Sequence, residues 1–133
     1  MARQIFDESK VSATIADQIG GGYEDTVTEA VDAVANNDIV IIGMAQNPFC
    51  KKACKAVNAA GKSYKYLEYG SYFKEWNRRG ALKMWSGWMT LPMVFVEGTL
   101  IGGCSDLQAL IALGEFDEIS SRTSDTVKIN LPV

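Results

Sequence analysis

The chain has 133 residues, of which 47% are hydrophobic and 22% are charged, a balance typical of one globular domain. Its net charge of −3 comes without a large basic block, which argues against nucleic-acid binding through phosphates. The sequence contains no histidine, which excludes hydrolase triads built on that base and His-ligated metal sites.

Cysteine usage and the short apolar segments indicate a compartment. Three cysteines are an odd number, and Cys50 and Cys54 lie too close together for a secreted disulfide framework. No apolar run approaches the roughly 20 residues that cross a bilayer, and MARQIFDESK lacks the apolar core of a signal peptide. We therefore expect reduced thiols, a location in the cytosol or an organelle matrix, and no membrane partner.

Residues 1–37 predict an N-terminal helical extension. Val11, Ile15 and Ile19 recur at helical spacing until the glycines at 20–22 end the pattern. A second, amphipathic helix follows and ends at Asn36-Asn37, and its apolar stripe consists of Val27, Ala30, Val31 and Val34.

Residues 38–119 predict an α/β domain. The β-branched run DIVIIGM (38–44) indicates a buried strand, and KSYKYLEY (62–69) a second strand after a helix that begins near Asn47. A helix is predicted for FKEWNRRGALKMW (73–85), a hairpin turning at Glu97-Gly98 for PMVFVEGTLIGG (92–103), and a last helix for CSDLQALIALGEF (104–116). The order is therefore β-α-β-α-β-β-α, and residues 120–133 form a polar tail.

Three motifs of this domain resemble those of the glutaredoxins, a family with the thioredoxin fold. NPFCKKACKAVNAAGKSY (47–64) matches the dithiol signature C-P-[YF]-C-K-K-A-K without a gap, except that Asn47 replaces the first Cys. TLP (90–92) matches the family's T-V-P, and GGCSDL (102–107) its G-G-C-x-D-L. RGALKMWSGWMTLP (79–92) is similar to a segment of the monothiol class. In both classes a Gly follows the nucleophile by fourteen residues, so Gly61 assigns that position to Asn47 and the resolving position to Cys50.

The resemblance implies a thioredoxin-like fold, with a four-stranded mixed sheet and, here, extra N-terminal helices. It also implies a glutathione site with a cis Leu91–Pro92 bond and a helix N-terminus for the ligand's γ-glutamyl carboxylate. The family's lysine is replaced by Met44, so Arg79 is the candidate for the glycine carboxylate. The residues expected to bind glutathione are Asn47, Phe49, Arg79, Leu91, Pro92, Gly103, Cys104, Ser105 and Asp106.

Catalysis depends on the thiol at the start of the first domain helix. A helix N-terminus stabilises a thiolate, and Cys50, the candidate catalytic residue, lies nearly one turn further in, where we expect a poorer nucleophile. Asn47-Pro48 is also a favourable helix start without any chemistry. Cys54 is expected to be a small buried hydrophobe, whereas Cys104 either reacts or only packs.

We therefore expect a glutaredoxin-like protein that binds glutathione or glutathionylated partners and has weak or no thiol-disulfide oxidoreductase activity. One alternative is an active glutathione-dependent enzyme that uses Cys50 as a single thiol. Another is a non-enzymatic binding or regulatory module. Iron–sulfur cluster binding is not expected, because Asn47 is a poor ligand beside thiolates.

Overall fold

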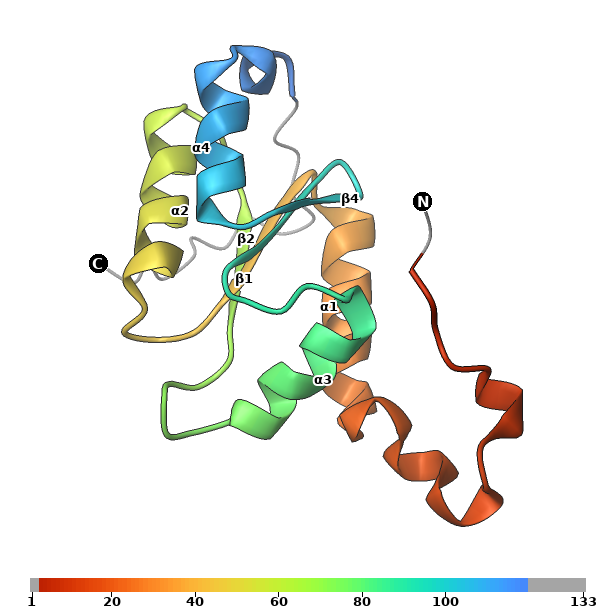
Figure 1. Cartoon of the computed structure of the whole chain (residues 1–133). Coiled ribbons are helices and arrows are strands. Elements are labelled where there is room, and N and C mark those ends of the chain that lie inside the picture. Colours follow the sequence, from red (N-terminus) through yellow and green to blue (C-terminus); the bar gives the residue numbers. More distant parts are fainter. Residues whose placement is uncertain (1–2, 120–133) are drawn as a thin grey trace.

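The computed structural model describes residues 3–119 (Figure 1). Two short 3₁₀ helices come first, and the predicted β-α-β-α-β-β-α order follows one further helix. The elements are η1 (Glu8–Lys10), η2 (Ala13–Gly21), α1 (Glu24–Asn36), β1 (Ile39–Gly43), α2 (Pro48–Ala59), β2 (Lys65–Glu68), α3 (Trp76–Ser86), β3 (Met93–Val96), β4 (Thr99–Gly102), α4 (Cys104–Ala112) and η3 (Glu115–Glu118).

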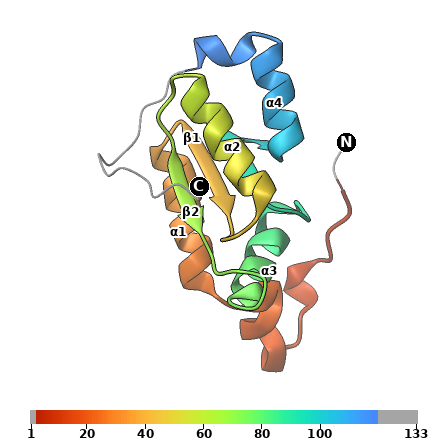
Figure 2. The same ribbon diagram turned by 90° about the vertical axis from the view of Figure 1, so that its left-hand side faces the viewer.

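A four-stranded mixed sheet forms the centre, in the order β2-β1-β3-β4. β1 pairs with β2 in parallel and with β3 antiparallel, and β4 closes the hairpin on β3. α2 and α4 cover one face of the sheet, and α1 and α3 cover the other (Figures 1 and 2). The predicted thioredoxin-like fold is confirmed.

Strand β1 is buried along its whole length because helices lie on both faces of the sheet. Ile39 and Ile41 pack with residues of α2 and α4, whereas Val40 and Ile42 pack with residues of α1 and α3. This alternation follows from the two-residue period of a strand. The continuous β-branched run that predicted a doubly covered strand is therefore explained by the layers on either side.

The turns and helix starts also follow the predicted chemistry. Glu97 and Gly98 connect β3 to β4 with φ of 49° and 82°, as expected for a two-residue hairpin turn. The Leu91–Pro92 bond is cis, as predicted. The beginnings of α2 and α4 lie at the same end of the sheet as the segment that precedes β3 (Figure 1).

The N-terminal region divides into two parts. The expected extra N-terminal helices are present as η1 and η2. Both are 3₁₀ helices, and they are separate because Val11 is extended (ψ 136°) and Ser12 caps the second one. This part projects from the body of the molecule (Figure 1). α1, in contrast, packs on the sheet through Ala30 and Ala33. The boundary expected between residues 37 and 38 therefore places this helix and the sheet that it covers in different parts of the chain.

The predicted tail, residues 120–133, lies outside the described residues. Among residues 3–119, no helix is both long enough and apolar enough to cross a membrane.

Candidate functional site

Helix α2 begins with Asn47 in the position that the sequence assigned to a nucleophilic thiol. The amide oxygen Oδ1 of Asn47 accepts the backbone N–H groups of Phe49 (2.9 Å) and Cys50 (3.0 Å), and Pro48 occupies the first helical position. These are the interactions of an N-cap residue, which satisfy donors that an α-helix leaves without partners. The side chain of Asn47 is therefore engaged in starting the helix.

Cys50 has no exposed surface. Its thiol lies over β1, where a Cβ added to Gly43 would be 2.9 Å from Cys50 Sγ and 2.9 Å from the Tyr66 hydroxyl. Because Gly43 has no side chain, it leaves space for the Cys50 thiol and the Tyr66 hydroxyl. Burial raises the pKa of the Cys50 thiol to about 11. A buried, protonated thiol is a poor nucleophile, so the geometry does not support the catalytic role considered for Cys50.

Cys54 is 1% exposed and packs in the core between α2 and the sheet, as expected for a small hydrophobe. Burial raises the pKa of this thiol to about 12. Within residues 3–119, Cys50, Cys54 and Cys104 are all free thiols.

A cavity of about 280 Å³ lies between the starts of α2 and α4. It brings together seven of the nine residues expected to bind glutathione, all except Asn47 and Arg79, and it adds Trp88 and Thr90, which were not in that set. Both belong to the GWMTLP segment (87–92). The resemblance of this segment to the monothiol class is the sequence feature that could have identified them as site residues. The cavity is lined by Phe49, Trp88, Thr90, Leu91, Pro92, Gly103, Cys104, Ser105 and Asp106.

The first turn of α4 forms one wall of this cavity. A carboxylate oxygen of Asp106 accepts the backbone N–H of Gly103 at 2.9 Å, which fixes the start of the helix. Gly102 has a φ of 119°, and a Cβ there would collide with the Asp106 carboxylate. The helix start therefore depends on a glycine at 102, and it directs backbone N–H groups toward the cavity, where they favour an anion.

Cys104 is the first residue of α4 and the one cysteine, of the three in the described chain, that lines the cavity. It is 6% exposed, and burial raises the pKa of its thiol, although the nearby charge of Lys52 acts in the opposite direction. The neutral thiol is therefore the favoured form at neutral pH.

Arg79, which was expected to meet the ligand's glycine carboxylate, does not line this cavity. It is only 7% exposed, and its Nη1 donates to the backbone oxygens of Tyr69 (3.0 Å) and Lys74 (2.7 Å). The physical reason lies in the loop before α3, whose carbonyl groups turn inward and bind the guanidinium. In the structure Arg79 therefore holds that loop, and its role toward a glycine carboxylate stays a prediction.

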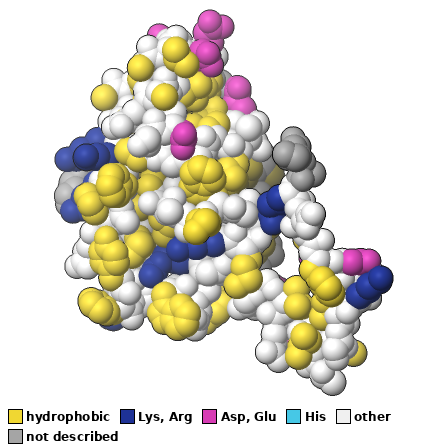
Figure 3. Space-filling model, viewed as in Figure 1, with side chains coloured by type: hydrophobic (Ala, Val, Ile, Leu, Met, Phe, Trp, Pro, Cys, Tyr) yellow, Lys and Arg dark blue, Asp and Glu magenta, His cyan; other side chains and the backbone are white. Residues whose placement is uncertain are grey.

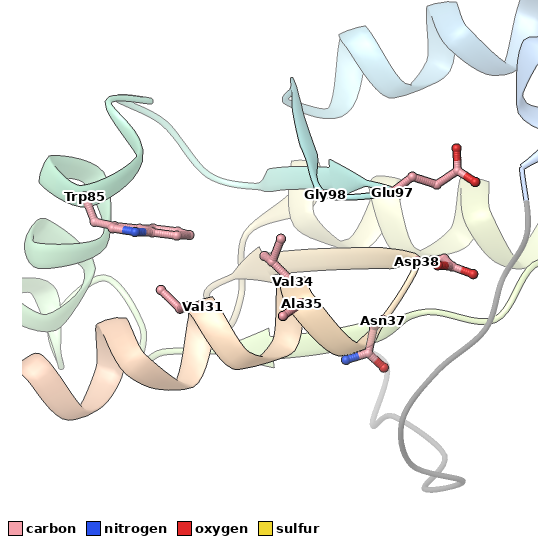
Figure 4. Close-up of a pocket in the computed structure, with 8 residues that line it drawn as sticks. All are labelled: Val31, Val34, Ala35, Asn37, Asp38, Trp85, Glu97 and Gly98. Atoms are coloured by element: carbon pink, nitrogen blue, oxygen red, sulfur yellow. The ribbon is translucent and has the colours of Figure 1, made fainter.

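A second cavity, of about 430 Å³, lies at the opposite end of the strands (Figure 4). Val31 and Val34 of α1 and Trp85 of α3 give it apolar walls, and the hairpin turn at Glu97-Gly98 borders it. None of the residues expected to bind glutathione lines this second cavity. Within residues 3–119, no cluster of three or more His, Cys, Asp or Glu side chains is arranged to hold a metal ion.

The sheet, the helix starts and the first cavity together define a thioredoxin-fold protein with an amide at the start of α2. Residues 39–101 match the glutaredoxin family model. A glutaredoxin-like protein of Dictyostelium discoideum is 44% identical over 98 residues, which cover 74% of this chain and 80% of that protein. The chain belongs to the glutaredoxin family.

Solved glutaredoxins have the same fold. The crystal structure of wheat glutaredoxin is 29% identical, with a TM-score of 0.63 over 74% of this chain and 92% of that one. A buckwheat glutaredoxin crystallised with glutathione is 24% identical, with a TM-score of 0.58 over 69% and 84% of the two chains. At that identity the buckwheat protein shows the fold alone.

Proposed function

We propose that the protein binds glutathione, free or attached to a partner protein, and that it is weak or inactive as a thiol-disulfide oxidoreductase. The observation that carries this proposal is the start of α2. An amide caps the helix where the resemblance expects the nucleophilic thiol, and the next thiol along the chain, Cys50, is buried. A protein with this arrangement retains a binding cavity without an accessible thiolate.

The cavity supports the binding half of the proposal. Glutathione is an extended peptide with two carboxylates, and the start of α4 offers backbone N–H groups to one of them. Phe49 and Trp88 provide apolar contact for the rest of the ligand. The buckwheat glutaredoxin was crystallised in complex with glutathione. Glutathione is therefore the first ligand to test here. A reducing compartment, in which all three thiols stay free, fits this proposal.

Two measurements test the proposal together. Titration with glutathione up to millimolar concentration should shift the NMR signals of Leu91 and of residues 103–106. A coupled assay of hydroxyethyl-disulfide reduction should give a rate near that of the uncatalysed reaction, for the native chain and for Cys50→Ser alike. Absence of shifts would refute glutathione binding, and a rapid rate that disappears in Cys50→Ser would establish Cys50 as a working nucleophile.

A further inference from the structure

The loop between β2 and α3, residues 69–75, is rigidly attached to the segment that leads into α2. The backbone N–H of Tyr69 donates to the Gly43 oxygen (2.9 Å), and the N–H of Ala45 donates to the Gly70 oxygen (2.8 Å). Ala45 lies two residues before Asn47. The loop is therefore held beside the start of α2, as Figures 1 and 2 also show.

The loop itself is a tight turn with a specific construction. Ser71 and Lys74 exchange two backbone hydrogen bonds of 3.1 and 3.2 Å, so that Tyr72 and Phe73 form its tip. Gly70 has a φ of 70°, and a Cβ there would collide with the Lys74 oxygen. The buried guanidinium of Arg79 donates a hydrogen bond to the backbone oxygen of Lys74 (2.7 Å). These contacts hold Tyr72 and Phe73 at the tip of the turn.

This tip presents aromatic side chains to solvent. Phe73 is 93% exposed and Tyr72 is 55% exposed, and Trp76, at the start of α3, is 65% exposed. Phe49, at the edge of the cavity, is 55% exposed. We call Phe49, Tyr72, Phe73 and Trp76 the aromatic face. Exposed aromatic groups on a rigid element are typical of protein-binding surfaces, where they contribute much of the binding energy.

Cations border the aromatic face. Lys51 and Lys52 lie two and three residues after Phe49, and Lys52 Nζ lies 5.7 Å from the centre of the Phe49 ring. Among residues 3–119, Lys51, Lys52 and Lys74 form no ion pair, whereas the neighbouring carboxylate of Glu75 is bound by Arg78 at 2.7 Å. Figure 3 shows yellow and dark blue side chains intermixed over the start of α2 and over α3, whereas the magenta carboxylates on this face lie mostly around α4 and on the N-terminal projecting part.

We propose that the aromatic face docks a segment of a glutathionylated protein that is rich in both carboxylates and apolar side chains. The apolar side chains of that segment would pack on the aromatic tip, and its carboxylates would meet the three lysines. The cavity beside Phe49 would hold the attached glutathione. This inference rests on the proposed function and deepens it, because it makes a modified protein, rather than free glutathione, the preferred ligand.

Synthetic peptides of about twelve residues test this inference. The first carries glutamates and leucines around a central cysteine in a disulfide with glutathione, the second has lysines in place of the glutamates, and the third is the first without glutathione. We expect the first to bind at least about tenfold more tightly than either the second or free glutathione, as a few aromatic anchors and complementary charges would provide. Equal binding of the acidic and basic peptides would overturn the inference.

Two variants assign the effect to the aromatic face. Replacement of Tyr72 and Phe73 by Ser should weaken binding of the acidic peptide about tenfold and leave free glutathione binding unchanged, because neither residue lines the cavity. Lys74→Glu should weaken the acidic peptide and strengthen the basic one. Leu113→Ser, which changes a 72% exposed residue just beyond α4, is the matched control and should alter neither.

The outcomes separate this inference from the proposed function. If free glutathione causes no shifts around residues 91 and 103–106 while the acidic peptide without glutathione still binds at the aromatic face, the docking surface stands and glutathione binding falls. If glutathione binds and the serine variant binds the acidic peptide as well as the native chain does, the docking surface falls and the proposed function stands.

Discussion

The amide oxygen of Asn47 accepts the backbone N–H of Cys50 at 3.0 Å, so the residue that the resemblance assigns to the nucleophile's position caps the helix turn that contains the buried thiol. Asn47 and Cys50 therefore each keep one feature of a dithiol site. Asn47 occupies the half-exposed position at the helix start, and Cys50 keeps the sulfur where solvent does not reach it. This relationship leads directly to a gain-of-function prediction.

Asn47→Cys should increase thiol-transfer activity by at least about tenfold, because the helix N-terminus that stabilises a thiolate is already in place. The same change removes the cap and should cost about 0.5–2 kcal/mol of stability. Hydroxyethyl-disulfide reduction measures the first effect and urea unfolding the second. Asn47→Ser is the matched control, since it retains a capping oxygen without a thiol and should stay inactive. An inactive Asn47→Cys protein whose new thiol reacts readily with iodoacetamide would show that the scaffold lacks more than its nucleophile.

Stability should fall as the pH rises above 9. Folding raises the pKa of the Cys50 thiol from 9.0 to about 11, so the folded chain holds this proton more tightly than the unfolded chain does. The stabilisation is fully present below pH 9 and is lost as the pH approaches 11, with a total on the order of 2 kcal/mol. Urea unfolding at pH 8 to 10.5 should show a flatter decline for Cys50→Ala than for the native chain. Parallel declines would mean that Cys50 is ionised as easily in the folded chain as in the unfolded one.

Arg79→Ala should lower the free energy of unfolding by about 2–4 kcal/mol, because it leaves the carbonyl oxygens of Tyr69 and Lys74 without their charged donor. Arg79→Lys should restore part of this loss, as one ammonium replaces the planar guanidinium. Glutathione affinity should change less than about threefold, since Arg79 lies outside the cavity. Loss of glutathione binding with unchanged stability would instead restore the carboxylate-binding role that the sequence predicted.

Gly102→Ala should disrupt the start of α4. Alanine would be held at the positive φ of residue 102 and its Cβ would collide with the Asp106 carboxylate, so we expect a cost of about 1–3 kcal/mol and weaker glutathione binding. Gly98→Ala is the matched control, because Gly98 also has a positive φ but has open space around its Cβ position and lies outside the cavity. Thermal unfolding and NMR titration measure the two effects. If both variants bind glutathione like the native chain, the start of α4 does not contribute to the site.

The sequence by itself determined the elements whose signals are local. The β-branched run at 39–42 indicates a strand covered on both faces, and Asn47-Pro48 specifies a helix start through one side-chain oxygen and one fixed φ. The Glu97-Gly98 turn follows in the same way, since it depends on residues close together in the chain. The motifs also located most of the cavity, because they lie at the ends of these elements.

The tertiary structure alone decided how the side chains at this end of the sheet are used. Whether Cys50 is exposed depends on Gly43 and Tyr66, which belong to two different strands. The partners of Arg79 are carbonyl oxygens of a loop whose turn no periodicity predicts. An arginine on a helix is compatible both with a ligand and with a buried structural role, and the choice is made by the electrostatic environment that distant segments create around it.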